Sequence, residues 1–422
     1  MKSFFKKMYR NIKNFYYNIC TQTDWTYCSM IILVLFGYVL LHDILGEKLL
    51  EHNIWDSYTL QAKAWLDGHT YLDKNYTHLE LAIYKGHFYV SFPPLPSVLL
   101  IPWVLLYGVK TPNNFIMIIY ILMAVTLVYV IAKHFKMRSV IAAFWAIVVV
   151  FGSNMLWMST MGGVWFQAQL LNMVFCLAAI YVMLNNKRII SYLCIAFAVG
   201  CRPFSIVYFF VLLIYYYNLD KKKNNSDSWI SIIIRQWKEI LSAAIVGILY
   251  MTYNFIRFDN PLEFGHNYLP EFIESKNGQF NVSYIITNLL RIFFGKIRIN
   301  KNLGLEFTKF DGFIIFIANP IFIIYICYII KNIIKKKNNN MTIVIAIMTM
   351  CNMLLLCLHK TMGGWQFGNR YLVDLIPFIL LFILITKQRE NRINKLAYWE
   401  RFVGVFAVMI NVYGAIIMRD LK

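Results

Sequence analysis

The sequence predicts an all-α membrane protein whose helices cross a bilayer many times. Hydrophobic residues make up 59% of its 422 residues and charged residues only 15%, whereas a water-soluble domain carries about 25% charged residues. Apolar windows of about 18–22 residues also recur along the chain, long enough to cross a bilayer core of about 30 Å. A β-barrel would instead show segments of about ten residues with alternating hydrophobicity, and none appear.

The apolar windows define the expected spans, which lie near residues 26–45, 93–109, 113–133, 139–158, 163–184, 189–219, 238–256, 312–331, 341–358, 371–386 and 400–418. Two of them need interpretation. The window 93–109 overlaps the proline-rich FPPLPSVLLIPW, and we expect it to lie along the outer membrane surface. The window 189–219 is too long for one span, and CRPF (201–204) interrupts it. Because proline breaks a helix and arginine favours an interface, we expect two half-spans. About 11 transmembrane helices result.

Charge predicts the orientation of the chain. The formal net charge is +20, but the lysines sit in short clusters between spans, as at 221–223 and 335–337, where they set membrane orientation and touch anionic headgroups. Nucleic-acid binding is therefore not expected. The N-terminus is basic and precedes a first span too long for a cleaved leader, so we expect an uncleaved anchor. The short basic loops then lie in the cytoplasm together with the N-terminus, and the C-terminus lies outside. We expect a multi-pass protein of the inner membrane.

This threading places three connecting segments on the outer face, namely the long loops 46–112 and 257–311 and the short loop 359–370. No internal repeat or low-complexity region is visible, so we expect one domain over residues 1–422 and no soluble C-terminal domain. The eight cysteines form no C-x-x-C pair and fall mostly in apolar runs. They are expected to be small buried apolar side chains rather than disulfides or a zinc site.

The first outer loop contains DSYTLQAKAWLDG, whose apolar residues repeat with helical spacing. This pattern predicts an amphipathic helix lying on the membrane. Asp56 stands at its start, where a carboxylate commonly caps a helix. From the residues alone, Asp56 can be either a helix cap or a catalytic group. The other carboxylates of the loop, Asp67, Asp73 and Glu80, cannot be ranked by chemistry alone.

The loop 359–370 leads into the stretch GGWQFGNRYLVD, residues 363–374, which places Arg370 at the mouth of a span. One interpretation is an anchor that reaches to lipid headgroups. The other is a binding site for an anion, since an arginine can bind a phosphate in two places. Asp374 lies one helical turn later and would neutralise part of this charge if it paired with Arg370.

Five sequence blocks resemble the GT-C superfamily of integral membrane glycosyltransferases, in the branch of the protein O-mannosyltransferases and the lipid A aminoarabinose transferases. They are, in the usual order, WDSYTLQAKAWLDGHTYL after the first span, GHFYVSFPPLP, RPF at 202–204, YNFIRFDNPLEFG at 253–265, and GGWQFGNRYLVDLIPF. Each block alone is weak, but the ordered set covers about 320 residues.

The resemblance implies a fold and an activity. Such enzymes take a sugar from a polyprenyl-phosphate carrier on the outer face and transfer it to an acceptor hydroxyl with inversion. A carboxylate of the first outer loop acts as the base, and Asp56 is the position that matches. A general base needs reach to the hydroxyl and a pKa tuned by its surroundings. The donor lipid, an unidentified glycan, lipid or protein acceptor, and membrane lipids are the partners that this implies.

The leaving phosphate needs cations and N–H donors. Arg370 is the first candidate to hold it, and Gly364 and Gly368 would let backbone N–H groups approach. The further substrate-binding candidates are Arg202, Arg257, His266, Lys85 and Trp365. Arg202 and Arg257 can equally be structural. Trp365 could stack on a sugar, but tryptophan is also enriched at membrane interfaces.

The chain departs from its relatives in two places. Asp56 is followed by Ser57 and Tyr58 rather than by a second carboxylate, so a divalent metal is doubtful and no cofactor is expected. Ser91 and Phe92 stand where the aminoarabinose branch has a lysine before its paired prolines. Two other classes remain open, a transporter or flippase for a lipid-linked glycan and a non-catalytic membrane scaffold, because fold does not fix function.

Overall fold

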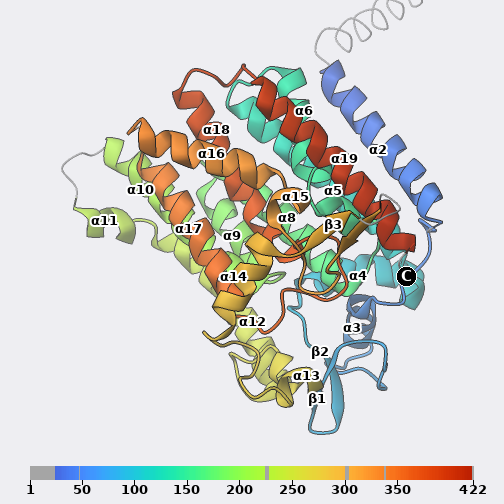
Figure 1. Ribbon diagram of the computed structural model, residues 1–422. Coiled ribbons are helices and arrows are strands. Elements are labelled where there is room, and N and C mark those ends of the chain that lie inside the picture. The colour runs from blue at the N-terminus through green and yellow to red at the C-terminus, as the bar shows by residue number, and fades with distance from the viewer. Residues whose placement is uncertain (1–23, 47, 224–227, 300–303, 337–338, 421–422) are drawn as a thin grey trace, which may run out of the picture.

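The computed structural model describes residues 24–420 except 47, 224–227, 300–303 and 337–338. The basic N-terminal segment, used above to predict orientation, therefore lies outside the described residues. Within them the chain is mostly helical, and its strands form two small hairpins (Figure 1). The all-α class predicted from the sequence is confirmed.

Eight helical segments of the described chain are long and apolar enough to cross a membrane. Two of them begin with a 3-10 turn that runs into an α-helix, η2 into α10 and η4 into α18. The eight are α2 (Trp25–Leu45), α5 (Asn113–His134), α8 (Val164–Leu184), η2 (Pro203–Tyr208) with α10 (Phe209–Lys223), α12 (Trp237–Phe258), α17 (Asn340–Cys357), η4 (Arg370–Leu375) with α18 (Ile376–Arg389), and α19 (Tyr398–Asp420).

Three of the eleven predicted spans are too short to count among these eight: α6 (Ser139–Phe151), α9 (Arg188–Val199) and α16 (Ile321–Ile334). α9 is one of the two half-spans expected within 189–219, whereas α6 and α16 are cut short by helix breaks. α6 stops before the separate turn α7 (Met155–Met158), and the turn α15 (Ile315–Ala318) precedes α16. The breaks pair with each other, because Asn154 N donates to Asn319 Oδ1 at 2.9 Å and Asn319 Nδ2 donates to Asn154 Oδ1 at 2.6 Å. Irregular backbone at membrane depth needs such internal partners.

The predicted interruption of the window 189–219 is confirmed. α9 ends at Val199 and η2 begins at Pro203. Proline has no N–H to continue the helix, and the residue before it, Arg202, is extended, with φ −141° and ψ 104°. The break leaves Arg202 on irregular backbone between two apolar helices.

The first outer loop carries the predicted amphipathic helix as α3 (Ser57–Leu66), which packs against α4 (Leu95–Tyr107). Tyr58 and Ala62 of the expected apolar stripe are buried, but Leu66 is exposed. Between the helices lies an antiparallel hairpin of β1 (Leu81–Tyr84) and β2 (His87–Val90), with Leu81 opposite Val90. The short turn η1 (Gly108–Lys110) follows α4.

The second outer loop also contains local structure. Its elements are η3 (His266–Tyr268), α13 (Pro270–Ile273), α14 (Tyr284–Phe294), and a second antiparallel hairpin of β3 (Ile297–Ile299) and β4 (Leu305–Phe307). Figure 1 shows α3, the β1–β2 hairpin and α13 at the lower end of the helix bundle, with α4, α14 and β3 nearer its middle, while α11 (Trp229–Ile234) lies at its side.

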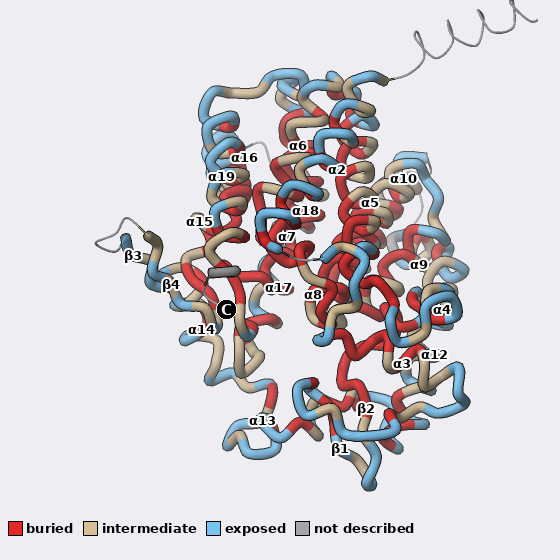
Figure 2. The backbone as a smooth tube through the Cα atoms, turned by 90° about the vertical axis from the view of Figure 1, so that its right-hand side faces the viewer, coloured by how far each residue is buried: buried red, intermediate tan, exposed pale blue. Residues whose placement is uncertain are grey.

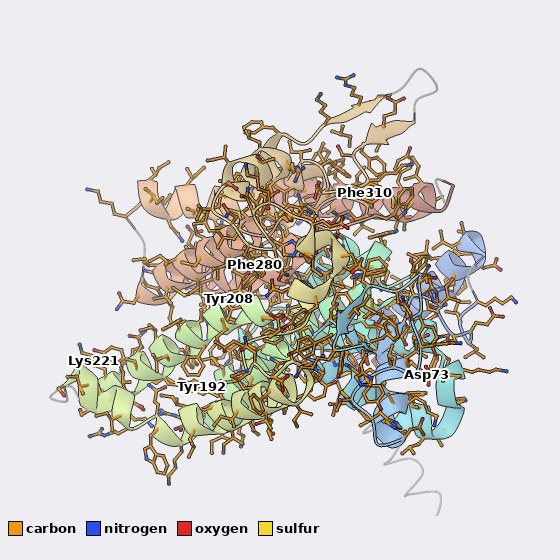
Figure 3. All side chains as sticks on the ribbon, turned by 90° about the horizontal axis from the view of Figure 1, so that it is seen from below. Asp73, Tyr192, Tyr208, Lys221, Phe280 and Phe310 are labelled. Atoms are coloured by element: carbon orange, nitrogen blue, oxygen red, sulfur yellow. The ribbon has the colours of Figure 1, made fainter. Side chains whose placement is uncertain are left out.

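Backbone hydrogen bonds tie the second outer loop to the loop 359–370. Lys360 N donates to Gln279 O at 2.8 Å, Asp311 N to Gly363 O at 2.9 Å, and Gln366 N to Lys309 O at 2.9 Å. Figure 3 views the molecule from below and labels Phe280 and Phe310, two residues of the second outer loop. The prediction that these two loops share one face is confirmed.

The buried core runs through the middle of the bundle, and the outer loops are more exposed (Figure 2). The segment Arg370–Arg389 is the most enclosed of the eight long ones, with 83% of its apolar window buried, against 11% for α12. The segment that begins with Arg370 is therefore a central helix, and the functional candidates at its start face the interior.

Candidate functional site

Two cavities open at the end of the bundle that carries the outer loops. The first, here called the arginine cavity, has a volume of about 320 Å³ and is lined by Arg202, His266, Gln279, His359 and Arg370 among apolar side chains. The second, here called the tryptophan cavity, has a volume of about 510 Å³ and is lined by Trp55, Glu80, Trp165, Phe310, Trp365 and Arg370. Both volumes are of the size that small-molecule sites have. Arg370 and Trp165 border both cavities.

Arg370 is held in place by two glutamines. Its backbone N–H donates to Gln366 Oε1 at 2.9 Å, and its Nη1 donates to Gln169 Oε1 at 3.1 Å. The guanidinium carbon lies 5.1 Å from the centre of the Tyr371 ring and 5.5 Å from that of Phe166. Arg370 is 4% exposed, and its Nε is buried without a hydrogen-bond partner.

The carboxylate nearest in sequence does not neutralise Arg370. Asp374 instead accepts from Arg202 Nε at 2.9 Å and from Asn172 Nδ2 at 3.1 Å. The alternative that Asp374 pairs with Arg370 is therefore wrong, because η4 turns as a 3-10 helix and directs Asp374 toward the helix break at Arg202. Within the described residues no carboxylate lies within ion-pair distance of Arg370. It is a buried cation without a paired anion, an arrangement that costs free energy.

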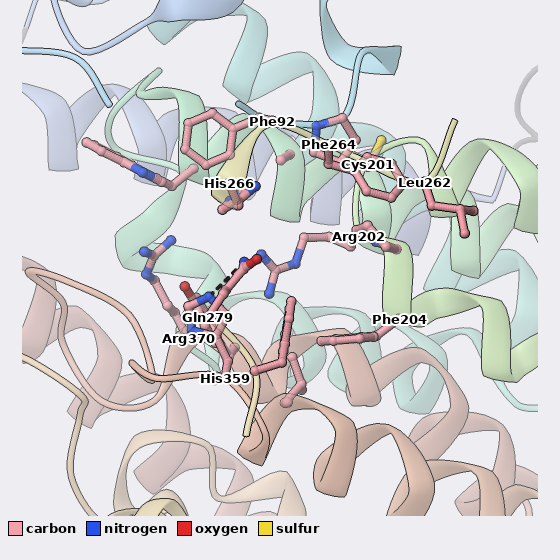
Figure 4. A pocket seen from close by; sticks show the side chains of 17 residues that line it. Phe92, Cys201, Arg202, Phe204, Leu262, Phe264, His266, Gln279, His359 and Arg370 are labelled. Atoms are coloured by element: carbon pink, nitrogen blue, oxygen red, sulfur yellow. Dashed lines mark hydrogen bonds between the residues drawn. The ribbon is translucent and has the colours of Figure 1, made fainter. Parts of the chain in front are cut away.

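Figure 4 shows both guanidinium groups at the arginine cavity, with His266 on one side and Gln279 and His359 on the other. His359 Nδ1 donates to Thr361 O at 2.7 Å, and Gln279 Nε2 donates to His359 Nε2 at 3.2 Å. Burial is the main cause that lowers the pKa of His359 to about 4 and that of His266 to about 3. The charge of Arg202 contributes at both rings, together with Arg370 at His359 and Arg257 at His266. Both rings are neutral at pH 7, so the positive charge of the cavity belongs to the arginines.

The tryptophan cavity combines aromatic walls with one carboxylate. Trp165 Nε1 donates to Glu80 Oε2 at 2.9 Å. The ring centres of Trp55 and Trp165 are 6.3 Å apart, and Lys309 Nζ lies 4.6 Å from the centre of the Trp365 ring. Surrounding protein partly desolvates the Glu80 carboxylate, which is nonetheless exposed, and this raises its pKa above the usual range, while the Trp165 hydrogen bond and the charge of Arg370 oppose the rise. Gly364 also lines this cavity.

Asp56 caps the N-terminus of α3, as the helix-cap interpretation expected. Its carboxylate accepts from Tyr58 N at 3.0 Å and Thr59 N at 3.3 Å, and from Gln167 Nε2 at 2.8 Å. The Thr59 hydroxyl and the Asn113 amide also donate to it. Burial raises the pKa of Asp56 to about 6, and these hydrogen bonds limit the rise. Asp56 is 0% exposed, although its neighbour Trp55 lines the tryptophan cavity. Its role as a base stays a prediction.

Three of the predicted substrate-binding residues line neither cavity. Arg257 is buried against aromatic rings and donates from Nη1 to Val90 O at 2.8 Å. Lys85 lies at the tip of the β1–β2 hairpin, where it pairs with Asp259 at 2.6 Å in an exposed position. Gly368 has φ +73°, and a Cβ there would lie 2.3 Å from that of Ala318, so it serves a close backbone approach.

Sequence reasoning singled out Arg202, His266, Gly364, Trp365 and Arg370, and each of these lines a cavity. It did not find Gln279, His359 or Trp165, and it could not rank Glu80. The one available signal was proximity in sequence, since His359 begins the loop that leads to Arg370 and Trp165 follows the glycine pair 162–163. No cluster of three or more His, Cys, Asp or Glu side chains suited to a metal ion occurs in the part of the chain that the structure describes.

Comparisons with known proteins give the following result. No family model matches the chain, and no curated protein matches it in sequence. Among solved structures it is similar to the oligosaccharyltransferase of Archaeoglobus fulgidus in the apo form, with 13% identity and a TM-score of 0.45 over 95% of this chain. It is also similar to the same organism's oligosaccharyltransferase AglB in complex with an inhibitory peptide and a dolichol-phosphate, with 12% identity, a TM-score of 0.47 and 95% coverage. This chain spans 56% of the length of either protein.

Proposed function

We propose that this protein is a membrane glycosyltransferase that moves a sugar from a polyprenyl-phosphate carrier to an acceptor hydroxyl on the outer face. The observation that carries the proposal is Arg370, a buried guanidinium without a paired carboxylate at the junction of two cavities. A buried cation is stable only when an anion or a set of acceptors offsets its lost hydration. A bound phosphate would supply that anion.

The arginine cavity would hold the phosphate. Arg370 has a free Nε, and Arg202 shares its charge with Asp374, so together they leave one net positive charge for the ligand. Arginine can contact two phosphate oxygens at once. The neutral rings of His266 and His359 add no second full charge, and the aromatic walls suit the apolar carrier chain next to its phosphate.

The transfer itself would proceed by direct displacement. A carboxylate takes the proton of the acceptor hydroxyl while the oxygen of that hydroxyl forms a bond to the anomeric carbon of the donor sugar. The bond from that carbon to the phosphate oxygen breaks, and its electron pair stays on the phosphate, where Arg370 stabilises the developing charge. A single displacement inverts the anomeric configuration.

Asp56 is proposed as the proton acceptor. Its pKa of about 6 leaves it mostly ionised at pH 7 yet basic enough to take a proton. Because Asp56 is fully buried next to Trp55, this role requires the Trp55 wall of the tryptophan cavity to move aside when the acceptor binds. The transfer rate should fall as the pH drops through about 6, since the carboxylate is then protonated.

The test compares cell-envelope glycans and polyprenyl-phosphate sugars by mass spectrometry in cells without the protein and in cells restored with wild type or Asp56→Asn. We expect a glycan to lose a sugar and its lipid donor to accumulate, and only wild type to repair both. General-base removal costs about 10²–10⁴-fold in rate. Asn also caps helices well, so α3 should persist.

Asp67→Asn is the matched control, since this exposed carboxylate lies in the same loop, pairs with Lys63 and lines neither cavity. It should restore the glycan fully. If Asp56→Asn also restores it, the base lies elsewhere. If cells without the protein still build the complete glycan but keep it on the inner face of the membrane, the protein moves lipid-linked glycans instead of making them.

A further inference from the structure

The tryptophan cavity differs in chemistry from the arginine cavity, although Arg370 and Trp165 border both. The arginine cavity presents cations and neutral histidines. The tryptophan cavity presents one carboxylate, Glu80, among aromatic rings. If a donor phosphate occupies the arginine cavity, the tryptophan cavity is the adjoining space from which an acceptor can reach the donor beside Arg370. This inference rests on the proposed function.

Glu80 is available for a ligand. One carboxylate oxygen, Oε2, accepts from Trp165 Nε1 at 2.9 Å. No described residue donates a hydrogen bond to the other, Oε1. A carboxylate can only accept hydrogen bonds when ionised, so its ligand must bring donors. It also repels anions, and the charge of Arg370 on the shared wall is assigned to the donor phosphate, so this cavity favours a neutral ligand that carries hydroxyl groups.

The aromatic walls narrow the ligand further. Trp55, Trp165 and Trp365 come from three separate segments, and Phe310 lies 6.1 Å from Trp365, ring centre to ring centre. The faces of aromatic rings carry partial negative charge. A sugar ring presents C–H groups on its faces and hydroxyl groups around its edge, so it matches both features. A peptide acceptor would instead call for several backbone donors and acceptors along the cavity.

We propose that the tryptophan cavity is the acceptor site, that the acceptor is a neutral carbohydrate, and that Glu80 binds its hydroxyl groups beside Trp365. The cavity, of about 510 Å³, has room for more than one sugar ring. The protein would then extend a glycan rather than modify a peptide or a lipid. Glu80 holds the acceptor in register with Arg370, and Asp56 keeps its separate role.

The experiment measures binding by isothermal titration to the protein in nanodiscs. The probes are neutral tetrasaccharides of glucose, mannose and N-acetylglucosamine, an uncharged Ser- and Thr-rich peptide, and geranylgeranyl phosphate. We expect at least one tetrasaccharide to bind wild type. Glu80→Ala and Trp365→Ala should each weaken it about tenfold, the cost of losing one hydrogen bond to a charged group or one aromatic contact. Glu80→Gln should retain part of the affinity, because its amide oxygen still accepts.

Two controls lie away from the cavities. Glu51→Ala removes an exposed carboxylate that pairs with Lys48, and Trp237→Ala removes an exposed indole on α12. Both variants should bind the tetrasaccharide as wild type does. Geranylgeranyl phosphate should bind all five variants, since none of them alters the arginines.

The outcomes separate the two proposals. If wild type binds geranylgeranyl phosphate but no tetrasaccharide, or binds the peptide in a manner sensitive to Glu80→Ala, the carbohydrate acceptor site is rejected and the proposed function stands. If a tetrasaccharide binds but Glu80→Ala and Trp365→Ala leave its affinity unchanged, the site lies elsewhere. If the phosphate lipid does not bind, the proposed function itself fails.

Discussion

Two buried cations of this protein have opposite environments. Lys387 on α18 is 1% exposed and lies 2.7 Å and 2.9 Å from the two carboxylate oxygens of Glu400, which also accepts from Tyr328. Arg370 begins the same central segment and is 4% exposed, but no described carboxylate pairs with it. One segment thus carries a neutralised charge at one end and an uncompensated charge at the other. The first stabilises the fold, and the second is suited to an anionic ligand.

The largest expected effect comes from breaking the neutralised pair. Lys387→Met leaves Glu400 buried without its partner, which costs about 3–5 kcal/mol of folding free energy. Thermal unfolding of the purified protein in detergent measures this loss. Lys387→Met with Glu400→Gln should recover much of the stability, because neither residue then carries a buried charge. If Lys387→Met alone were as stable as wild type, the Lys387–Glu400 pair would not hold α18 to α19.

The second effect separates the two arginines of the arginine cavity. Arg370→Gln should weaken binding of geranylgeranyl phosphate by about 10–100-fold, the worth of a charge-assisted hydrogen bond. Its folding stability should not fall, since the variant removes a buried cation that has no partner. Isothermal titration and thermal unfolding of the same preparations measure both quantities.

Arg202→Gln is the matched control for that prediction. It leaves Asp374 buried and unpaired, so the protein should lose stability in the way that Lys387→Met does, by a smaller amount because Arg202 is partly exposed. If Arg370→Gln destabilises the protein as much as Arg202→Gln, the guanidinium of Arg370 is a structural element and the proposed phosphate site is wrong.

The smallest effect is expected at Lys85, a predicted substrate-binding residue that the structure places in an exposed ion pair with Asp259. Exposed pairs of this kind contribute little. Lys85→Ala should therefore change neither stability nor geranylgeranyl phosphate binding. A measurable loss of lipid binding would mean that the β1–β2 hairpin reaches the ligand, and it would restore Lys85 as a candidate.

The sequence was informative about the helices because their apolar windows have the length of a bilayer. It could not reveal the breaks within 139–158 and 312–331 as a pair, because they depend on hydrogen bonds between Asn154 and Asn319, which lie 165 positions apart. The break at Arg202 was predictable because Pro203 supplies a local cause.

The candidate site was predictable where a residue type is unusual for its surroundings. Arg370 is a charged residue at the start of an apolar segment, and it lines both cavities. Glu80 is one carboxylate among several in a polar loop, so only the packing of Trp165 against it distinguishes it. The partner of Asp374 stayed open because sequence spacing allows a pair with Arg370, whereas the actual partner, Arg202, lies far away in the sequence.

The hydrogen bonds between the second outer loop and the loop 359–370 also limit how the cavities can open. Lys360, Asp311 and Gln366 are all backbone donors across this seam. If one of the two loops moved alone to widen a cavity, these hydrogen bonds would break, whereas moving both loops together breaks none of them. Opening and closing around a ligand should therefore be a rigid-body motion of both loops as one flap, hinged where they join α12, α15, α17 and η4.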